Sequence, residues 1–279
     1  MVREGYLYQR RYCGSVKALI VDWAGTVIDY GSRAPAGVFV EVYKRHGVAI
    51  SIAEARIPMG MEKRDHIQAL AEMPGVAARW VEANGTPITA ADIDGMYDEF
   101  LPLQLECLPQ HADLIPGTLG IVATCRARGI KIGSSTGYAR VLMNVVAAEA
   151  KKRGFAPDAI VCADDVPQGR PAPWMCFANL QQLGVWPVES AIKLDDTAPG
   201  IEAGLNAGMW AVGVAESGNE MGLSRAELAA LSPAEHNARI HRAYDRLYRA
   251  GAHYVINSIA DLLPVLESIE RRLEAGDRP

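Results

Sequence analysis

Short apolar runs alternate with helix-like stretches along most of the chain. The first run, Lys17–Asp22 (KALIVD), is rich in branched side chains and is soon followed by Gly25, as is typical of a buried parallel strand. Similar runs follow at Ile130–Ser134, Ala159–Cys162, Ala191–Asp195, Trp210–Val214 and His253–Ile256. Helices are expected over Pro116–Arg128, Arg140–Arg153, Pro173–Leu183, Pro199–Ala207 and Ser258–Leu273. This alternation predicts an α/β fold with a doubly wound, Rossmann-like parallel sheet.

The segment between the first and second predicted strands contains no convincing strand. It reads as a series of helices, over Ala36–His46, Ile52–Ile57, Lys63–Glu72, Val76–Asn84 and Ala90–Leu105. Because a crossover between parallel strands needs only about a dozen residues, a gap of about eighty residues predicts a separate helical unit. We therefore expect a helical cap domain at residues 32–109, called the insert, and an α/β core domain formed by residues 1–31 and 110–279.

Composition and charge narrow the classes of function. The 279 residues carry a net charge of −5, from 28 Lys and Arg against 33 Asp and Glu, so we expect no nucleic-acid partner. No apolar run approaches the roughly 18–20 residues of a membrane span, and the N-terminal stretch lacks the apolar part of a signal peptide, so we expect no membrane association. The five cysteines are widely spaced and form no CxxC pair, which favours reduced thiols in a cytoplasmic protein.

Two of the predicted strands end in carboxylates. Asp22 ends the first strand, at the edge of the sheet where open α/β folds bind ligands, and Gly25 lets the chain turn sharply toward an anion. Asp195 and Asp196 end a later strand, and two adjacent carboxylates are costly unless a cation neutralises them. Their all-oxygen donor set favours Mg²⁺. The ordinary alternatives are a carboxylate that caps a turn, at Asp22, and a solvated acidic turn, at the acid pair.

Two further motifs have groups that can hold an anion. Ser134–Tyr138 (SSTGY) ends the second strand, where hydroxyl and backbone N–H groups at a helix start can bind phosphate, although Thr136 could equally cap that helix. Arg170 lies between Gly169 and Pro171, which restrict the chain and favour a bidentate grip on a phosphoryl group. A lone arginine before a helix is more often a surface residue. Each motif is weak alone, and their order along the chain is the stronger signal.

These four motifs, in this order and with a helical insert after the first strand, resemble the haloacid dehalogenase superfamily. Four segments resemble the phosphonoacetaldehyde hydrolases (phosphonatases) more closely: DWAGT at 22–26, PMGMEKRDH at 58–66, GSSTGY at 133–138 and DVPQGRPAPW at 165–174. With NAGMW at 206–210, the resemblance extends from about residue 17 to the tail. It implies a haloacid dehalogenase core with a small α-helical cap inserted after the first strand.

The resemblance implies a hydrolase that converts phosphonoacetaldehyde and water into acetaldehyde and phosphate, in the degradation of 2-aminoethylphosphonate. Lys63 would form a Schiff base with the aldehyde, so that cleavage of the bond to phosphorus yields an enamine. The pKa of Lys63 must be lowered for its amine to attack. His66, on the same helical face, would move protons during imine formation, and Asp22 would attack phosphorus. Without this motif, Lys63 would be interpreted as a solvated helix lysine.

The resemblance also implies how the substrate and a metal ion are held. Thr136 and Arg170 would hold the phosphoryl oxygens, and the other substrate-binding residues would be Met59, Gly60, Gly25, Thr26 and Tyr138. Mg²⁺ would be bound by Asp22, the backbone carbonyl of Ala24, Asp196 and Asp195. Ala24 stands where phosphatases of the superfamily carry an aspartate that protonates a leaving alkoxide, which an enamine does not need. In some members of the family, the last motif has a glycine at the position of Asp195 and its first aspartate at the position of Asp196. Asp196 is therefore the surer metal ligand.

Other functions remain open on the sequence alone. A phosphatase of the same superfamily, acting on a small phosphate ester, would use Asp22 and Mg²⁺ but is disfavoured by Ala24. A haloacid dehalogenase proper needs no Mg²⁺, and Lys63 would have no role in its reaction. A binding scaffold without activity would retain this set of side chains only by coincidence. Because the phosphonatases form dimers, we expect a homodimer, and the apolar stretch Ala36–Tyr43 could supply a contact.

Overall fold

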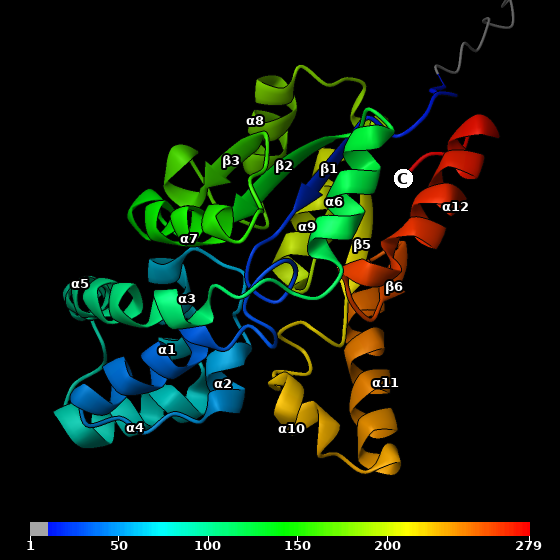
Figure 1. Ribbon diagram of the computed structural model, residues 1–279. Helices are drawn as coiled ribbons and strands as arrows, with labels where there is room; N and C mark the ends of the chain where they lie inside the picture. The colour runs from blue at the N-terminus through cyan, green and yellow to red at the C-terminus, as the bar shows by residue number, and fades with distance from the viewer. Residues whose placement is uncertain (1–10) are drawn as a thin grey trace, which may run out of the picture.

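A six-stranded, fully parallel sheet forms the centre of the computed structural model, which describes residues 11–279 (Figure 1). The strands are β1 (Ala18–Val21), β2 (Lys131–Thr136), β3 (Ala159–Cys162), β4 (Ala191–Asp195), β5 (Trp210–Val214) and β6 (Tyr254–Ile256). Their order across the sheet is β3-β2-β1-β4-β5-β6. The strand order reverses between β1 and β4, which is where ligand sites form in such sheets. The predicted doubly wound α/β fold is confirmed.

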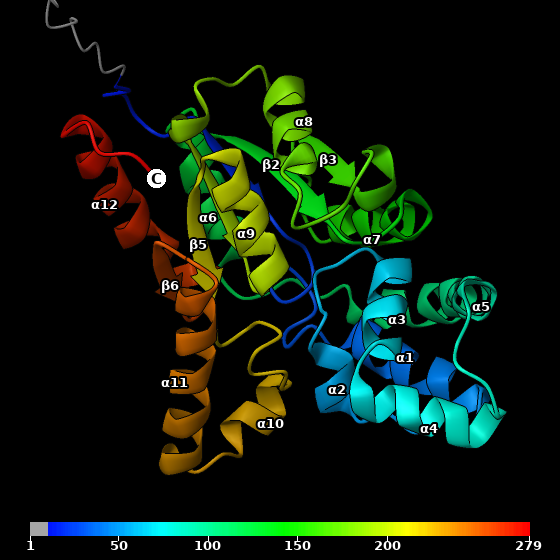
Figure 2. The same ribbon diagram turned by 180° about the vertical axis from the view of Figure 1, so that it is seen from behind.

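Helices cover both faces of the sheet. They are α6 (Thr118–Ala127), α7 (Arg140–Lys152), α8 (Trp174–Leu183), α9 (Ala198–Ala207), α11 (Pro233–Arg249) and α12 (Leu262–Glu274). Leu19 and Val21 of β1 pack in one hydrophobic cluster with α6, α7 and α12. Ala18 and Ile20 point to the opposite face, toward α8 and α9, which lie in front of the sheet in Figure 2. Since both faces are buried, the strands are apolar along their whole length.

Helices α1 to α5 form a second packed unit beside the core, between β1 and β2 in sequence (Figure 1). They are α1 (Ala34–Arg45), α2 (Ile52–Arg56), α3 (Lys63–Ala71), α4 (Pro74–Asn84) and α5 (Ala90–Cys107). Their own hydrophobic core includes Phe39, Val42, Ile67 and Phe100. This core supports a separate insert, whose limits at residues 32 and 109 stay a prediction. Because Phe39 and Val42 are buried here, Ala36–Tyr43 does not offer the apolar surface that a dimer contact would need.

Two helices after β5 were not predicted from the apolar pattern. They are α10 (Arg225–Ala229) and α11, and each begins with a capping box. In α11, the Ser232 hydroxyl accepts the backbone N–H of Glu235, whose carboxylate accepts the backbone N–H of Ser232 in return. This helix buries only a narrow stripe that includes Ile240 and Leu247. Its few apolar residues still recur at helical spacing, so this period and the capping boxes were both usable signals.

The two ends of the insert lie side by side. An isolated antiparallel bridge pairs Ile28 with Leu114, and the backbone N–H of Asp29 donates to the carbonyl oxygen of Asp113 at 3.2 Å. The side chain of Asp29 also contacts the second end, because its Oδ1 lies 3.0 Å from Nδ1 of His111. The chain therefore leaves the core and returns to it at one place, where the two connecting segments are hydrogen-bonded to each other.

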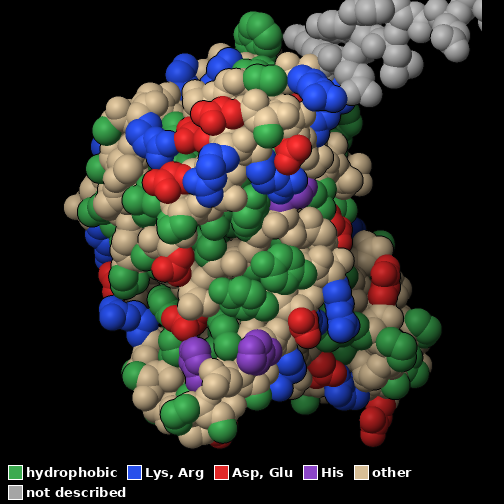
Figure 3. Space-filling view, turned by 90° about the vertical axis from the view of Figure 1, so that its right-hand side faces the viewer, with side chains coloured by type: hydrophobic (Ala, Val, Ile, Leu, Met, Phe, Trp, Pro, Cys, Tyr) green, Lys and Arg blue, Asp and Glu red, His purple; other side chains and the backbone are tan. Residues whose placement is uncertain are grey.

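The surface carries charges of both signs. In Figure 3, basic and acidic side chains are interspersed over the visible face, with hydrophobic side chains between them. Within residues 11–279, helices long and apolar enough to span a bilayer are absent. The cysteines are free thiols, and Cys125, Cys162 and Cys176 are buried. Burial keeps these three thiols away from solvent oxidants.

Candidate active site

A small cavity lies between the insert and the carboxyl ends of β1 and β2. Its volume of about 20 Å³ holds little more than one water molecule. Most residues predicted from the sequence line it: Asp22, Ala24, Thr136, Tyr138 and Arg170 from the core, with Met59, Gly60 and Lys63 from the insert. The cavity as it stands is too small for a metabolite, so a substrate reaches these residues only when the insert moves away from the core.

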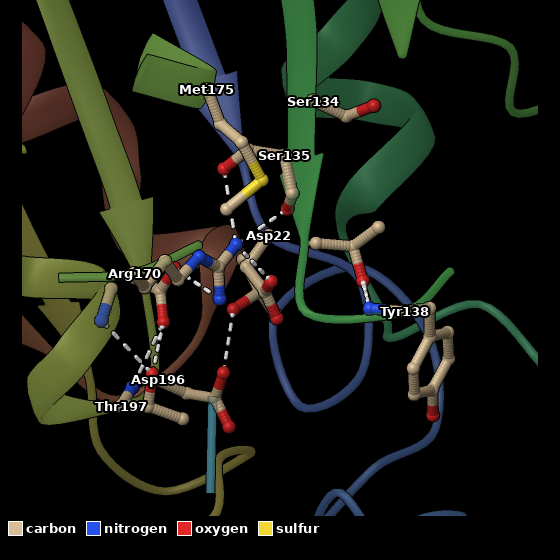
Figure 4. Close-up of polar contacts among 12 residues, drawn as sticks. Asp22, Ser134, Ser135, Tyr138, Arg170, Met175, Asp196 and Thr197 are labelled. Carbon is tan, nitrogen blue, oxygen red and sulfur yellow. Dashed lines mark hydrogen bonds and ion pairs between the residues drawn. The ribbon is translucent and has the colours of Figure 1, made fainter. Parts of the chain in front are cut away.

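Asp22 and Arg170 form a buried ion pair at this cavity (Figure 4). Arg170 Nη2 lies 2.6 Å from Asp22 Oδ1, and it also donates to the carbonyl oxygen of Ser135 at 2.6 Å and to the Ser135 hydroxyl at 3.0 Å. Burial raises the pKa of the Asp22 carboxyl, and the Arg170 guanidinium opposes that rise. Arg170 thus orients the Asp22 carboxylate and favours its ionised form in a site without bulk water.

Thr136 ends β2 and reaches the same cavity. Its Oγ1 accepts the backbone N–H of Tyr138 at 3.1 Å. The following helix, α7, begins only at Arg140, so Thr136 does not cap it. The hydroxyl proton of Thr136 can therefore be donated to a group in the cavity.

Asp195, the first member of the acid pair, is neutralised by protein cations. Lys193 Nζ lies 2.6 Å from Asp195 Oδ2, and Arg170 Nη1 lies 3.3 Å from the same oxygen. Thr197 Oγ1 donates to Asp195 Oδ1 at 2.7 Å. Although burial acts to raise the pKa of Asp195, Arg170 and Lys193 hold it below its usual value. Asp195 is thus an ionised carboxylate whose charge already has two partners.

Asp196 is the carboxylate that lacks a cation. Its Oδ1 accepts the Thr26 hydroxyl at 3.2 Å and its Oδ2 accepts the backbone N–H of Asn219 at 2.8 Å. Within residues 11–279, no Lys, Arg or His nitrogen lies within 4.0 Å of it. Burial, followed by Asp22 and Asp195, raises the pKa of Asp196 well above its usual range. An added cation would remove this cost.

The three aspartates together fit a divalent metal ion. One carboxylate oxygen from each of Asp22, Asp195 and Asp196 lies within 4.8 Å of the others, and all three residues are buried. An all-oxygen donor set of this kind suits a hard cation. Since Asp195 is already engaged, Asp22 and Asp196 are the carboxylates best placed to bind it.

Gly25 and Thr26 lie beside Asp196 and do not line the cavity. Gly25 has a φ of 82°, and a Cβ there would lie 2.1 Å from Asp196 Oδ2. A side chain at this position would therefore displace the carboxylate. The structure places these two predicted substrate-binding residues where they orient Asp196.

Lys63 brings an amine from the insert into the site. It is the first residue of α3, whose N-terminus is capped by the Glu62 carboxylate, and only 2% of it is exposed. Its Nζ lies 5.0 Å from the centre of the Tyr138 ring and 5.7 Å from that of Phe39. Burial lowers the pKa of Lys63 to about 8, against the opposing effect of nearby carboxylates. About a tenth of the amine is therefore neutral at pH 7, far more than for an ordinary lysine.

His66 lies behind Lys63 and does not line the cavity. Its Nε2 lies 2.9 Å from the carbonyl oxygen of Ala55, so Nε2 carries the proton, and its ring stacks on Phe39 with centroids 3.7 Å apart. Its Nδ1 is buried and has no hydrogen-bond partner in the described part of the chain. Burial and the charge of Lys63 lower the pKa of His66 well below its usual value. His66 is thus a neutral imidazole with a free lone pair on Nδ1.

Known proteins match this chain over nearly its whole length. A family model for haloacid dehalogenase-like hydrolases matches residues 16–208. The phosphonoacetaldehyde hydrolase of Paraburkholderia phytofirmans is 50% identical over 264 residues, which cover 95% of this chain and 99% of that protein. That of Nitratidesulfovibrio vulgaris is 46% identical over 274 residues, or 98% of each chain. The chain belongs to the phosphonoacetaldehyde hydrolase family.

A solved structure agrees with this family assignment. The crystal structure of a phosphonoacetaldehyde hydrolase-like protein from Oleispira antarctica has a TM-score of 0.96 and 43% sequence identity to this chain. The match covers 99% of this chain and 100% of that one. Members of the phosphonoacetaldehyde hydrolase family thus share the insert as well as the core, and this chain is a hydrolase.

Two glycines let the insert of this family member close on the core. A Cβ on Gly60 would lie 2.2 Å from Thr197 Oγ1, and a Cβ on Gly137 would lie 2.4 Å from the carbonyl oxygen of Met61. Gly60 also has a φ of 95°, which favours glycine. The contact between insert and core is therefore too close for side chains at either position.

Two residues near the aspartates were not singled out from the sequence. Lys193 lies two positions before Asp195, so both side chains point to the same face of β4. A lysine two positions before an aspartate, in an otherwise apolar strand, was the sequence signal that could have revealed the ion pair between Lys193 and Asp195. Asn219 lies in the loop after β5, and no sequence pattern connects it with Asp196.

Proposed function

We propose that this chain hydrolyses the carbon–phosphorus bond of phosphonoacetaldehyde to give acetaldehyde and phosphate, in the degradation of 2-aminoethylphosphonate. Members of its family carry that enzyme's name. The observation that carries the proposal is the meeting of two nucleophiles in one cavity. Lys63 supplies an amine with a lowered pKa, and Asp22 supplies an oriented carboxylate. The amine is suited to attack an aldehyde carbon, and the carboxylate is suited to attack phosphorus.

In the first step, the neutral amine of Lys63 attacks the aldehyde carbon. The carbonyl oxygen leaves as water, and a protonated imine remains on Lys63. Proton transfers are needed in both directions, because the amine loses protons while the oxygen gains them. Counted from the lysine ammonium, the nitrogen gives up two protons and the carbonyl oxygen takes up two, so the step balances with no other proton source. The free lone pair on Nδ1 of His66 can carry such a proton from nitrogen to oxygen, and the lowered pKa of His66 means that it holds the proton only briefly.

In the second step, an oxygen of Asp22 attacks phosphorus. The electron pair of the carbon–phosphorus bond moves into the imine, which becomes an enamine, and Asp22 becomes an aspartyl-phosphate. Arg170 and Thr136 are placed to hold the phosphoryl oxygens. Ala24 offers no acid to a leaving group, which suits an enamine and disfavours a phosphate ester.

The cycle ends with two hydrolyses. The enamine carbon takes a proton, and water releases acetaldehyde from Lys63. A second water releases phosphate from Asp22. Since imine formation gives up one water, the balance is one water consumed for each substrate. An insert that closes over the bound substrate would limit the water near the imine until the insert opens.

We propose Mg²⁺ as the cofactor, held by Asp22, the backbone carbonyl of Ala24 and Asp196. The uncompensated charge of Asp196 beside Asp22 supports this choice. When bound, Mg²⁺ offsets the negative charge that would otherwise repel a phosphoryl group from Asp22. Asp195 stays bonded to Lys193 and Arg170, so its role is to fix the loop that presents Asp196.

We further propose that the enzyme works in the cytoplasm as a homodimer. The free cysteines support a reducing compartment. The dimer rests on the resemblance to the phosphonatases, and its interface does not involve the buried face of α1.

The direct test of the function is a coupled assay of the purified protein. With phosphonoacetaldehyde and Mg²⁺, we expect equal amounts of acetaldehyde and phosphate. Excess chelator should remove this activity, whereas a dehalogenase would not depend on Mg²⁺. Small phosphate esters serve as the comparison substrates. Turnover of the esters without any cleavage of phosphonoacetaldehyde would refute the proposal in favour of a phosphatase.

Gly60→Ala should lower kcat/KM for phosphonoacetaldehyde by roughly a hundredfold, because a side chain against Thr197 keeps the insert from closing. The matched control is Gly85→Ala. Gly85 has a φ of 77°, but nothing lies within 4 Å of an added Cβ, so this variant shares the backbone strain without the clash. Steady-state kinetics and melting temperatures of both variants check the prediction. Equal losses of activity would attribute the effect to strain alone.

A further inference from the structure

Arg56 links the insert to two segments of the core. It ends α2, and its guanidinium donates from Nη1 to the carbonyl oxygens of Gly31 at 2.9 Å and Ser32 at 3.3 Å, in the first linker. Nη1 also donates to Asn219 Oδ1 at 3.0 Å, and Nη2 donates to the carbonyl oxygen of Gly222 at 3.1 Å. These acceptors are neutral oxygens at fixed places, so they orient the guanidinium by geometry, while the carboxylates of Asp29 and Asp196 act on its charge from farther away.

The loop after β5 packs closely against Arg56. Gly222 has a φ of 63°, and a Cβ there would lie 2.7 Å from Arg56 Cζ. Asn219 is only 4% exposed and returns a hydrogen bond, from its Nδ2 to the carbonyl oxygen of Arg56 at 3.2 Å. Arg56 and Asn219 therefore form a reciprocal pair across the junction between insert and core.

The same loop also orients Asp196. The backbone N–H of Asn219 donates to Asp196 Oδ2 at 2.8 Å. A Cβ on the neighbouring Gly218 would lie 2.4 Å from Asp196 Cβ, so the loop backbone packs directly on this carboxylate. One residue, Asn219, thus contacts the insert with its side chain and Asp196 with its backbone.

We propose that Arg56 is a positioning residue that couples docking of the insert to the orientation of Asp196, and hence to the affinity for the metal ion. The inference rests on the proposed role of Asp196 as a metal ligand. When the insert docks, Arg56 fixes Asn219, and the N–H of Asn219 fixes Asp196 Oδ2. When the insert leaves, the loop loses that support. Because such coupling is reciprocal, metal binding favours the docked insert to the same degree.

The test measures Mg²⁺ binding by isothermal titration calorimetry without substrate. In Arg56→Ala, we expect the Kd for Mg²⁺ to rise about 5- to 10-fold, at the lower end of typical coupling strengths. Asn219→Ala keeps the backbone N–H that Asp196 accepts but loses both side-chain contacts to Arg56, so we expect a similar rise. The double variant should be no worse than either single variant, since both remove one coupling.

Arg45→Ala is the matched control, because Arg45 is an arginine of the insert whose one partner among residues 11–279 is Glu41, on the exposed side of α1. Its Kd for Mg²⁺ should equal that of the wild type. Amide hydrogen exchange adds a second readout: exchange in residues 215–222 should rise in Arg56→Ala and not in Arg45→Ala. If Arg56→Ala does not fold, Arg56→Lys provides the test, since an ammonium cannot span the same acceptors.

Three outcomes decide the inference. Folded Arg56 variants with weaker Mg²⁺ binding and faster loop exchange support it. Folded Arg56 variants with lower melting temperature but a Kd for Mg²⁺ within twofold of the wild type overturn it, and leave the proposed function intact. A wild type that binds no Mg²⁺ overturns both the metal site and the coupling.

Discussion

Replacing Lys63 with arginine should reduce phosphate release from phosphonoacetaldehyde by several orders of magnitude. The substitution keeps the positive charge, but a guanidinium is protonated at any working pH and cannot form an imine. Without the imine, the electrons of the carbon–phosphorus bond have no acceptor. If Lys63 only attracted an anionic substrate, Lys63→Arg would keep much of the activity.

Borohydride trapping of the wild type measures the same step directly. With phosphonoacetaldehyde present, the reduced adduct should form on Lys63 and be detected by mass spectrometry. Since the pKa of Lys63 is lowered to about 8 and only the neutral amine attacks, the trapping rate should rise with pH up to about 8 and then level off. Lys44→Arg is the control, because Lys44 is an insert lysine whose side chain is 75% exposed. Near-normal phosphate release by Lys63→Arg, or no adduct at Lys63, would defeat the mechanism.

Asp22→Asn should abolish phosphate release while leaving imine formation on Lys63 intact. An amide oxygen is a poor nucleophile toward phosphorus, whereas Lys63 acts on the other end of the substrate. Arg170 keeps Asp195 as a partner at 3.3 Å, so the substitution does not leave a buried charge unpaired. The measurements are phosphate release and borohydride trapping on the same variant.

A control variant and a second substrate test whether the loss of phosphate release is specific to Asp22. Asp113→Asn, at a side chain that is 89% exposed, should match the wild type in both measurements. Acetyl phosphate, which has its own good leaving group, should phosphorylate Asp22 in Lys63→Arg but not in Asp22→Asn. Phosphate release by Asp22→Asn at a normal rate would show that water, rather than this carboxylate, attacks phosphorus.

The sheet and the insert could be predicted because each leaves a strong local pattern. Both faces of the sheet are covered, so the strands are continuous apolar runs, and the gap before β2 is too long for a crossover. Helix α11 was missed although both the helical spacing of its apolar residues and its capping box at Ser232 were visible in the sequence.

The site could be predicted only where a motif carries it. The motifs located Asp22, Lys63, Thr136 and Arg170, and the structure brings these side chains to one cavity. The state of the acid pair could be predicted only in part: Lys193, two positions before Asp195, was visible in the sequence, whereas the approach of Arg170 to Asp195 and of the Asn219 N–H to Asp196 depends on the fold. The contact between Arg56 and Asn219 joins positions far apart in sequence, and neither residue type is unusual in a loop or at a helix end.

The tied ends of the insert have an evolutionary consequence. Because Ile28 pairs with Leu114 where the chain leaves and re-enters the core, a short loop could join these two positions if everything between them were removed, and α6 would still form the crossover from β1 to the parallel strand β2. The insert is in that sense a replaceable module, because the Asp22 carboxylate belongs to the core. Exchange of such a module could bring a new side chain to the Asp22 carboxylate without altering the sheet that holds it. Under the proposed mechanism, a lysine delivered in this way would change phosphoryl transfer from oxygen into cleavage at carbon.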